Sequence, residues 1–166
     1  MHNAHDSETP AGVSAFLPDE AATLAAGAAL AGALAPGLRI FLGGDLGSGK
    51  TTLVRGMLRG LGFRGKVKSP TFTLVEVYTV SNLDLYHFDL YRFNDPSEWE
   101  EAGFREYFNP ASVCIVEWPE KAGGLLPSPD LEIQLALHES GRWLRAAART
   151  PEGRPCLAAL KTATGG

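Results

Sequence analysis

Gly43-Gly44-Asp45-Leu46-Gly47-Ser48-Gly49-Lys50-Thr51-Thr52 is the stretch that decides the fold of this chain. Its residues 44–51 match G-x-x-x-x-G-K-[ST], the pattern of a phosphate-binding loop. The apolar run 38–42 before it predicts a strand, and the amphipathic run 52–61 after it predicts a helix. Strand, loop and helix in this order are the context in which such a loop binds phosphate, so they favour that interpretation over a chance glycine-rich turn.

The residue types of the loop suit a polyphosphate. Successive backbone N–H groups must point into one concavity, and glycines allow the dihedral angles and the close approach that this requires. The N-terminus of the following helix adds partial positive charge. Lys50 can reach the β- and γ-phosphates, and the hydroxyl of Thr51 can bind Mg²⁺. The stretch therefore predicts a nucleotide site that uses a magnesium ion.

A second strong signal is the run Ser-Val-Cys-Ile-Val-Glu-Trp-Pro-Glu at residues 112–120. Four apolar residues followed by Glu117 are typical of a buried parallel strand with a carboxylate at its C-terminal tip. Ligand sites of open α/β sheets lie at that edge, and NTPases usually place an Asp there for Mg²⁺. A Glu is longer by one methylene but can bind the ion directly or through water. Glu117 is therefore a candidate metal ligand. For Trp118 the sequence leaves three roles open: a lid, an interface residue or plain packing.

Two β-rich runs between these signals predict a hairpin. Residues 74–78 form the first strand, a turn follows at Ser81-Asn82, and residues 83–91 form the second strand. In the second strand Asp89 shares one face with His87. A carboxylate inside an apolar strand is costly without a partner, and a magnesium or nucleotide site supplies one. For His87 we favour the ordinary role of a hydrogen-bonded strand residue.

Further segments each have two interpretations. Residues 69–73 lie where small NTPases carry a nucleotide-sensing switch loop, but a proline turn explains them equally well. The cations in 64–68 could contact RNA, although a solvated loop is the commoner case. Glu20 could face the nucleotide or the helix surface. Arg142 could likewise reach the nucleotide, although exposed strand arginines are common.

The remaining patterns predict a mixed α/β content. A helix is expected from residue 17 to 34 with Asp19 near its start, and another begins at Asp95-Pro96. A second hairpin is expected from strands 131–137 and 141–145. Two side chains, Trp99 and Phe104, are expected to pack the second helix, and residues 155–161 are expected to form a short helix.

Length and composition limit the class of protein. The chain has 166 residues, 45% of them hydrophobic, and we expect one domain from residue 14 to 166 after a disordered segment 1–13. A net charge of −4 argues against strong binding of nucleic acid by the chain as a whole. No signal peptide or membrane-spanning run is evident, so we expect a cytoplasmic protein without membrane contact. Cys114 lies in an apolar run and is expected to be buried.

Four segments together resemble one family closely. These are GDLGSGKTT, SPTFTLVEVY, HFDLYR and VEWPE, in this order and spacing, and the resemblance runs from about Leu17 to at least Arg142. In these segments the chain resembles the TsaE (YjeE) family, the small P-loop ATPases of bacterial tRNA threonylcarbamoyladenosine synthesis. HFDLYR and EWPE are far more specific than the phosphate loop, and none of the four segments departs from the family pattern.

The resemblance implies a fold, an activity and partners. The fold would be a three-layer P-loop NTPase-like α/β domain whose mixed sheet includes antiparallel hairpins. The chain would bind ATP with Mg²⁺ and hydrolyse it slowly alone. It would act with the subunits TsaD and TsaB, which modify the adenosine beside the anticodon, and would contact tRNA only indirectly. ATP hydrolysis would reset that complex between turnovers.

The resemblance also implies roles for residues. Thr51 and Glu117 would hold the metal, and the catalytic residues would be Lys50, Asp89 and Glu117. The residues implied to contact the nucleotide are Glu20, Gly44, Asp45, Leu46, Gly47, Ser48, Gly49, Lys50, Thr51, Thr52 and Arg142. The motifs contain no obvious arginine finger, which agrees with a low rate in the absence of a partner.

Two other functions stay open at this point. The first is a small-molecule or nucleoside kinase on the same fold, although such kinases usually carry a lid rich in arginine, and here a hairpin and an acidic helix occupy that segment. The second is a nucleotide-gated binding module without significant turnover. Release of phosphate without an acceptor distinguishes an ATPase from a kinase.

Overall fold

A computed structural model describes residues 12–45 and 47–165 of the chain. Its strands are β1 (Gly12–Leu17), β2 (Arg39–Gly43), β3 (Val75–Val80), β4 (Leu83–Asp89), β5 (Ser112–Glu117), β6 (Leu131–His138) and β7 (Gly141–Ala148). Its α-helices are α2 (Glu20–Ala31), α3 (Lys50–Leu61), α4 (Ser97–Ala102) and α5 (Arg154–Thr164). Three short 3-10 helices are η1 (Phe104–Tyr107), η2 (Pro119–Leu125) and η3 (Pro151–Gly153).

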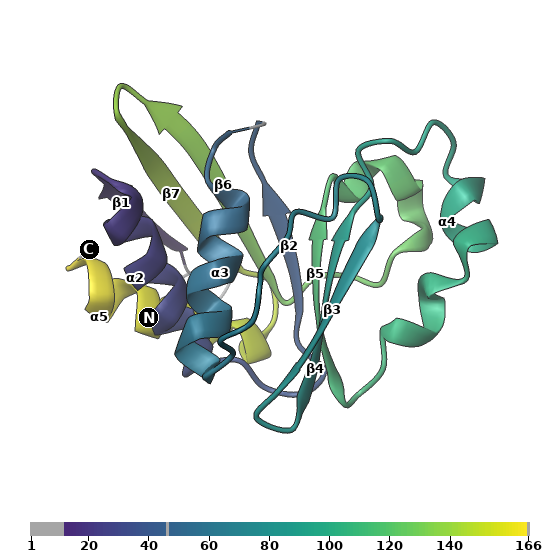
Figure 1. Cartoon of the computed structure of the whole chain (residues 1–166), viewed down its shortest axis with the longest axis horizontal. Coiled ribbons are helices and arrows are strands. Elements are labelled where there is room, and N and C mark those ends of the chain that lie inside the picture. Colours follow the sequence, from purple (N-terminus) through teal and green to yellow (C-terminus); the bar gives the residue numbers. More distant parts are fainter. Residues whose placement is uncertain (1–11, 46, 166) are drawn as a thin grey trace, which may run out of the picture.

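The strands form one seven-stranded mixed sheet in the order β1-β7-β6-β2-β5-β4-β3 (Figure 1). Its centre is parallel, because β2 runs parallel to both β5 and β6, and β5 runs parallel to β4. The flanks are antiparallel: β3 pairs with β4, and β7 lies between β6 and β1. Both predicted hairpins are therefore confirmed. The edge strands are β1 and β3.

Helices cover both faces of the sheet, which gives the predicted three layers (Figure 1). On one face α2, α3 and α5 bury the larger apolar core, with Leu53 and Leu157 among its members. On the other face α4, η1 and η2 enclose a smaller core around Phe88 and Trp99, whose ring centroids lie 5.7 Å apart. Phe104 joins this aromatic cluster, so the predicted packing of the second helix is confirmed.

Several predicted boundaries are shifted by a few residues. Strand β1 was not predicted: Gly12 and Val13 pair with β7 as part of it, so the expected disorder up to residue 13 is wrong for these two residues, and residues 1–11 lie outside the description. Because β1 extends to Leu17, the helix expected from residue 17 to 34 begins only at Glu20, and it ends at Ala31. Helix α3 begins at Lys50, not at residue 52, because Gly49 at φ +103° ends the loop there. β4 ends at Asp89, not at residue 91, because the carboxylate of Asp89 accepts the N–H of Tyr91 and turns the chain.

Other local predictions agree with the structure. Asp19 caps α2 by accepting the N–H of Ala22 at 2.8 Å. At the start of α4, Glu98 accepts the backbone N–H of Asp95 at 3.1 Å, and the helix itself begins at Ser97, directly after the expected Asp95-Pro96 start. Cys114 is buried, and burial raises the pKa of its thiol to about 12. None of the helices in the described part of the chain is long and apolar enough to cross a bilayer.

The two helices beside the phosphate loop are packed closely through glycines. A Cβ atom added to Gly27 of α2 would overlap the backbone oxygen of Leu53 and lie 2.8 Å from the backbone nitrogen of Met57 in α3. Gly56 of α3 meets the backbone of α2 in the same way, 3.1 Å from the Cα of Gly27. This contact places α3 against the sheet, and α3 carries the phosphate loop at its N-terminus.

We predict that Gly27→Ala lowers the free energy of unfolding by about 1–3 kcal/mol, the usual cost of overpacking. Helix propensity alone would favour alanine by about 1 kcal/mol, so the sign tests the close packing. Urea denaturation followed by circular dichroism measures the change. The control is Gly32→Ala at the exposed end of α2, where the nearest atom to an added Cβ is 3.9 Å away. Equal stability of both variants would contradict the prediction.

Candidate functional site

The C-terminal ends of the central strands meet at one edge of the sheet, and the sequence signals meet there with them. β2 runs directly into the phosphate loop, and β4 and β5 end in Asp89 and Glu117. These two acids are paired neighbours in the register of β4 and β5, and Glu117 is also opposite Leu42 of β2. Parallel strands that end at the same edge bring together residues far apart in sequence. The predicted loop and both predicted acids therefore lie side by side.

A cavity of about 710 Å³ opens at this edge between the phosphate loop and the strand tips. The predicted site residues that line it are Glu20, Gly47, Gly49, Lys50, Thr51, Thr52, Asp89, Glu117 and Arg142. Ser69, Thr71 and Ser140 also line it, although sequence reasoning did not include them among the site residues. Of the loop residues, Ser48 is buried beneath the cavity wall, and Leu46 lies outside the described residues.

A larger cavity of about 960 Å³ lies beside the first one and includes Gly44, Asp45 and Lys50 in its lining. It extends along η2 and β6, past Trp118 and Gln134. Because Thr51, Asp89 and Glu117 line the smaller cavity and not this one, the groups able to act on a phosphate face the smaller cavity.

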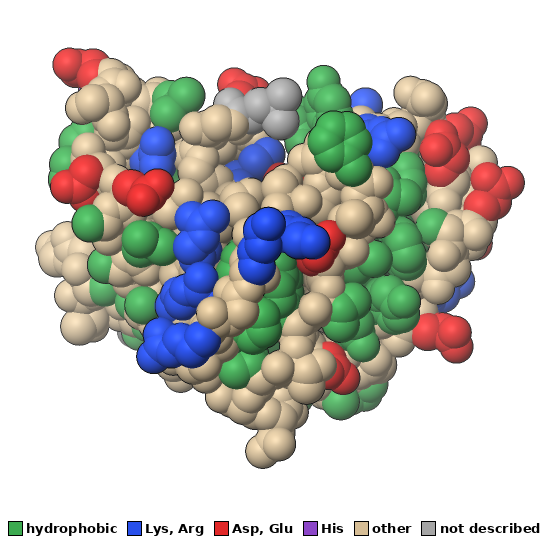
Figure 2. Space-filling model, in the orientation of Figure 1, with side chains coloured by type: hydrophobic (Ala, Val, Ile, Leu, Met, Phe, Trp, Pro, Cys, Tyr) green, Lys and Arg blue, Asp and Glu red, His purple; other side chains and the backbone are tan. Residues whose placement is uncertain are grey.

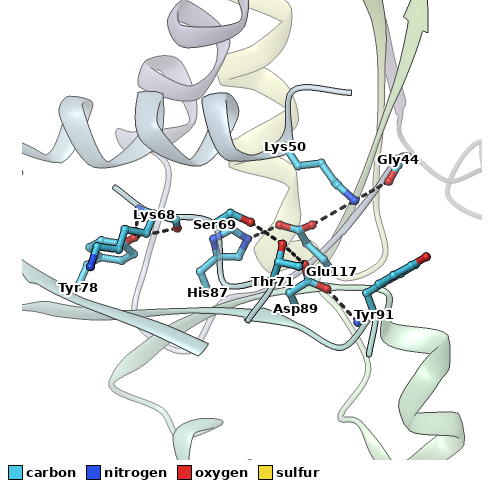
Figure 3. A network of polar contacts seen from close by, with 10 residues as sticks. All are labelled: Gly44, Lys50, Lys68, Ser69, Thr71, Tyr78, His87, Asp89, Tyr91 and Glu117. Atoms are coloured by element: carbon cyan, nitrogen blue, oxygen red, sulfur yellow. Dashed lines mark hydrogen bonds and ion pairs between the residues drawn. The ribbon is translucent and has the colours of Figure 1, made fainter. Parts of the chain in front are cut away.

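A buried network of charged side chains forms the floor of the smaller cavity (Figure 3). Nζ of Lys50 lies 3.1 Å from Oε1 of Glu117 and donates to the carbonyl oxygen of Gly44 at 2.5 Å. Oε2 of Glu117 lies 2.5 Å from Nε2 of His87. Lys50, His87 and Glu117 are 6%, 0% and 3% exposed, so the surrounding protein, not water, must satisfy them. The network therefore holds the Glu117 carboxylate between two fixed nitrogen atoms.

The partners of Glu117 decide its charge. Burial alone would raise the pKa of its carboxyl group, but the hydrogen bond from His87 and the charges of His87 and Lys50 outweigh burial and lower this pKa below its ordinary value. Glu117 therefore carries its negative charge at neutral pH. A charged carboxylate at the tip of β5 is the form that can bind a cation.

Asp89 lies in the opposite electrostatic situation. Burial raises its pKa, and the charge of Glu117 raises it further. Hydrogen bonds from the Tyr91 N–H at 2.9 Å and the Thr71 hydroxyl at 3.3 Å, together with the charge of Lys50, only partly offset this rise. Asp89 thus binds a proton more readily than an ordinary aspartate. Two neighbouring carboxylates with pKa values shifted in opposite directions are typical of acid–base sites.

The segment that could be either a switch loop or a proline turn has features of both. Pro70 to Leu74 form a turn closed by a hydrogen bond from the N–H of Leu74 to the carbonyl of Pro70 at 2.8 Å. The same turn brings the hydroxyl of Thr71 to Asp89, and Ser69 bonds Thr71 at 2.8 Å. The segment is therefore a turn that contacts the site through the side chains of Ser69 and Thr71.

Arg142 and Glu20 reach the opposite end of the cavity. Nη1 of Arg142 lies 3.5 Å from the hydroxyl of Thr23, and a Cβ on Gly49 would come within 2.9 Å of the same nitrogen. Gly49 is therefore needed both for its backbone conformation and for space. Nε of Arg142 is buried and has no hydrogen-bond partner among the described residues. Glu20 lines the cavity but is exposed.

Two residues have closer contacts with the site than the sequence indicated. His87 is a hydrogen-bonded strand residue, as predicted, but its partner is Glu117. The alternation that places His87 on the face of Asp89 was the one signal for this contact. Trp118 adopts φ +57°, and its ring lies 5.1 Å below Nζ of Lys50 and 5.1 Å from the ring of Tyr91. It therefore packs within the chain, against the lysine of the phosphate loop.

The pKa shift of Asp89 predicts a dependence of stability on pH in the nucleotide-free protein. Because this pKa is raised, the folded state holds the proton more tightly, and the free energy of unfolding falls as pH rises from the ordinary aspartate pKa to the raised value. Asp89→Asn removes the titration and keeps an acceptor for the Tyr91 N–H. The variant should be more stable than the wild type above this pH window, and the difference should shrink below it.

Urea denaturation at several pH values between about 4 and 8 measures this difference. Asp84→Asn, on the same strand but half-buried and bonded to Thr79, serves as the matched control. A wild type that is more stable than Asp89→Asn at neutral pH would overturn the assignment of a raised pKa.

Comparison with known proteins identifies a family that this chain matches. The model of one family, described as "Threonylcarbamoyl adenosine biosynthesis protein TsaE", matches residues 17–144. A Haemophilus influenzae protein named tRNA threonylcarbamoyladenosine biosynthesis protein TsaE is 43% identical over 150 residues, which cover 87% of this chain and 95% of that protein. A Bacillus subtilis protein of the same name is 46% identical over 98 residues, covering 59% and 61%.

A solved structure agrees with the family match. The crystal structure of YdiB from Bacillus subtilis superposes with a TM-score of 0.78 at 29% sequence identity and covers 93% of this chain and 97% of that one. The matched residues 17–144 include the phosphate loop, both buried carboxylates, His87 and Arg142. The resemblance of the four motifs is thereby confirmed, and the chain belongs to the TsaE family of threonylcarbamoyl adenosine biosynthesis proteins.

Proposed function

We propose that this chain is a magnesium-dependent ATPase that acts with the TsaD and TsaB subunits in the threonylcarbamoyladenosine modification of tRNA and resets that transferase complex by hydrolysing ATP. The observation that carries the proposal is the buried pair of Lys50 and Glu117 beneath a phosphate loop, with Asp89 beside it. The names of the relatives from Haemophilus influenzae and Bacillus subtilis support the pathway. The partners and the reset role rest on the family resemblance.

The residues at the cavity fit a magnesium ion bound together with a nucleotide. Within the described ranges no group of three or more His, Cys, Asp or Glu side chains could hold a metal by itself. Mg²⁺ instead usually takes one or two carboxylates and completes its coordination with water and substrate phosphates. Thr51, Asp89 and Glu117 line one cavity, and Glu117 is charged. Thr51 and Glu117 would hold the ion, which when bound would neutralise charge on the phosphates.

The phosphates would be held by Lys50 and by the N–H groups of the loop. The ammonium group of Lys50 has one donor left beyond those directed at Gly44 and Glu117, and Lys50 lines the cavity. Helix α3 begins at Lys50, so its N-terminus adds favourable charge at the same place. Positioning and charge neutralisation are the main contributions that a protein makes to phosphoryl transfer.

Asp89 would orient the attacking water. Its carboxylate lies within the cavity wall, is fixed by Tyr91 and Thr71, and has a raised pKa that makes it a better proton acceptor than an ordinary aspartate. Among the described residues that line the cavity, Lys50 and Arg142 are the cations, and Arg142 contacts Thr23 beside Gly49. No second arginine is placed to act on the phosphates, which supports a low rate in the absence of partners.

We predict that Lys50→Ala lowers ATP hydrolysis by about 100-fold or more, because a charged donor to the developing transition-state charge is lost. Phosphate release with ATP and Mg²⁺, with and without the TsaD–TsaB complex, measures the effect. Phosphate release without any acceptor also separates the ATPase from a kinase. The matched control is Arg55→Ala, a half-buried cation on α3 that does not line the cavity. Normal turnover of Lys50→Ala would contradict the site.

The same variant tests the pathway in cells. Depletion of the protein should lower the threonylcarbamoyladenosine content of tRNA, measured by mass spectrometry of nucleosides. Arg55→Ala should restore it, and Lys50→Ala should not. Unchanged modification after depletion would contradict the proposed pathway role even if the isolated protein hydrolyses ATP.

We predict that the two carboxylates affect different steps. Glu117→Gln should weaken Mg²⁺-dependent nucleotide binding by about 10- to 100-fold, the effect of losing one charge-assisted contact. Asp89→Asn should lower kcat by about 100-fold with little effect on nucleotide affinity. Fluorescent nucleotide titrations with and without Mg²⁺, set beside steady-state phosphate release, resolve the two effects. Asp84→Asn is again the control, and identical defects in both site variants would refute the division of roles.

A further inference from the structure

Phe72 is an aromatic side chain displayed almost completely to solvent. It is 81% exposed, more than any other large apolar side chain that the structure describes. Scattered exposed apolar residues are normal, but a phenylalanine exposed to this extent forgoes most of the stabilisation that burial of its ring could provide. Its exposure therefore needs an explanation, either from the local backbone structure or from a contact that the ring makes with a partner.

The turn that carries Phe72 is held in place by hydrogen bonds. The N–H of Leu74 bonds the carbonyl of Pro70 at 2.8 Å, and the N–H of Asp89 bonds the carbonyl of Leu74 at 2.9 Å. Leu74 has φ +72°, a left-handed conformation that is unfavourable for a residue with a side chain. Such strain persists only where the surrounding structure imposes it. The exposure of Phe72 is thus built into the turn.

This turn connects the cavity to the surface through adjacent residues. Thr71 lines the cavity and bonds the carboxylate of Asp89, and Phe72, the next residue, faces solvent. A nucleotide that changes the contact of Thr71 with Asp89 acts directly on the turn. The position of the Phe72 ring is therefore linked to the state of the nucleotide site by a single peptide unit.

Arg92 places a positive charge against the displayed ring, and three more cations precede the turn in the sequence. The guanidinium carbon of Arg92 lies 5.7 Å from the centre of the Phe72 ring, and Nη1 of Arg92 lies 3.3 Å from the Phe72 carbonyl oxygen. Before the turn come the exposed cations Arg64, Lys66 and Lys68, none of which forms an ion pair with another described residue. Figure 2 shows Lys and Arg side chains gathered over α3 and the loop that follows it. The chain as a whole carries −4, so this surface is a local exception.

We propose that the Pro70–Leu74 turn is a nucleotide-linked docking element for a protein partner, and that Phe72 inserts into an apolar pocket with an acidic rim on that partner. An aromatic ring at the centre of a contact, surrounded by charges, is the usual form of an interface hot spot. The inference rests on the proposed function for the identity of the partner, the TsaD–TsaB complex, and assigns the surface that binds it.

Three observations favour a protein over RNA as the occupant. Single-stranded RNA binds on rows of aromatic side chains, and here one ring is fully displayed. Arg59, which could extend the cationic surface, is engaged by the carbonyls of Phe63 and Gly65 at 3.0 and 2.8 Å. With a net charge of −4, the chain also lacks the broad cationic field that a polyanion requires.

Phe72→Ala tests the proposal, because an exposed side chain can be removed without a cavity in the core. Binding of the TsaD–TsaB complex to the full chain, titrated with ATP and with ADP, should weaken by about 30-fold in the ATP state, the effect of losing a hot-spot residue. Affinity for a fluorescent ATP analogue and thermal stability should not change. The matched control is Phe16→Ala, the same side chain on β1 at the opposite edge of the sheet, 40% exposed.

A second variant, Arg92→Glu, tests the acidic rim independently of the aromatic ring. It should weaken binding of the complex more at low salt than at high salt, because it turns an attraction into a repulsion. Unchanged binding by both variants, while the wild type binds, would overturn this inference and leave the proposed function intact. A wild type that does not bind the complex would overturn the partner and this inference together. Loss of tRNA binding by isolated Phe72→Ala would show that RNA is the occupant.

Discussion

The negative charge of Glu117, buried at the tip of a central strand, is the constraint on which the rest of the structure depends. An isolated carboxylate at 3% exposure would cost several kcal/mol, so its position requires fixed partners. Lys50 from the phosphate loop and His87 from the neighbouring strand supply them. The pairing therefore joins three segments, the loop after β2 and the strands β4 and β5, at one edge of the sheet. Any shift of register in these strands would leave the charge without its partners.

The same constraint explains why the neighbouring acid behaves differently. Lys50 and His87 both contact the carboxylate of Glu117. The closest partners of Asp89 are therefore the Thr71 hydroxyl and the Tyr91 backbone N–H. Burial and the charge of Glu117 then raise its pKa. One carboxylate that stays charged and one that accepts a proton more readily can divide the tasks of holding a cation and orienting water. The two carboxyl groups are chemically almost alike. Their pKa values differ because Glu117 has two nitrogen partners, Lys50 and His87, whereas Asp89 has a hydroxyl and a backbone N–H.

The contacts of Asp89 extend from the cavity to the surface. Thr71 bonds it from within the cavity wall, and its own backbone N–H bonds the carbonyl of Leu74 at the end of the same turn. The turn is thus fixed at two points by one strand residue, and it displays Phe72 between them. In a family of threonylcarbamoyl adenosine biosynthesis proteins, a surface linked in this way to the cavity at the phosphate loop is where the proposed partner would sense the state of that cavity.

The sequence by itself determined the phosphate loop, both carboxylates, both hairpins and the α/β class, because these depend on local patterns: glycines at fixed spacing, alternation along strands and turn residues between them. It also carried the family motifs. The sequence did not reveal β1, because that strand depends on pairing with β7, and it placed the start of α3 two residues late, because the conformation of Gly49 decides that end.

Only the tertiary structure decided which residues meet across the sheet. His87 and Glu117 are thirty residues apart in sequence, and the alternation of the strand indicates only that His87 shares the face of Asp89, not that it is hydrogen-bonded to Glu117. The strand order places β4 beside β5 and so brings them together. The sequence likewise does not indicate that Phe72 is exposed, because an aromatic residue beside a strand is usually buried in the core. Contacts between distant segments and the fraction of a side chain left in water are properties of the packed chain, because they depend on which elements become neighbours.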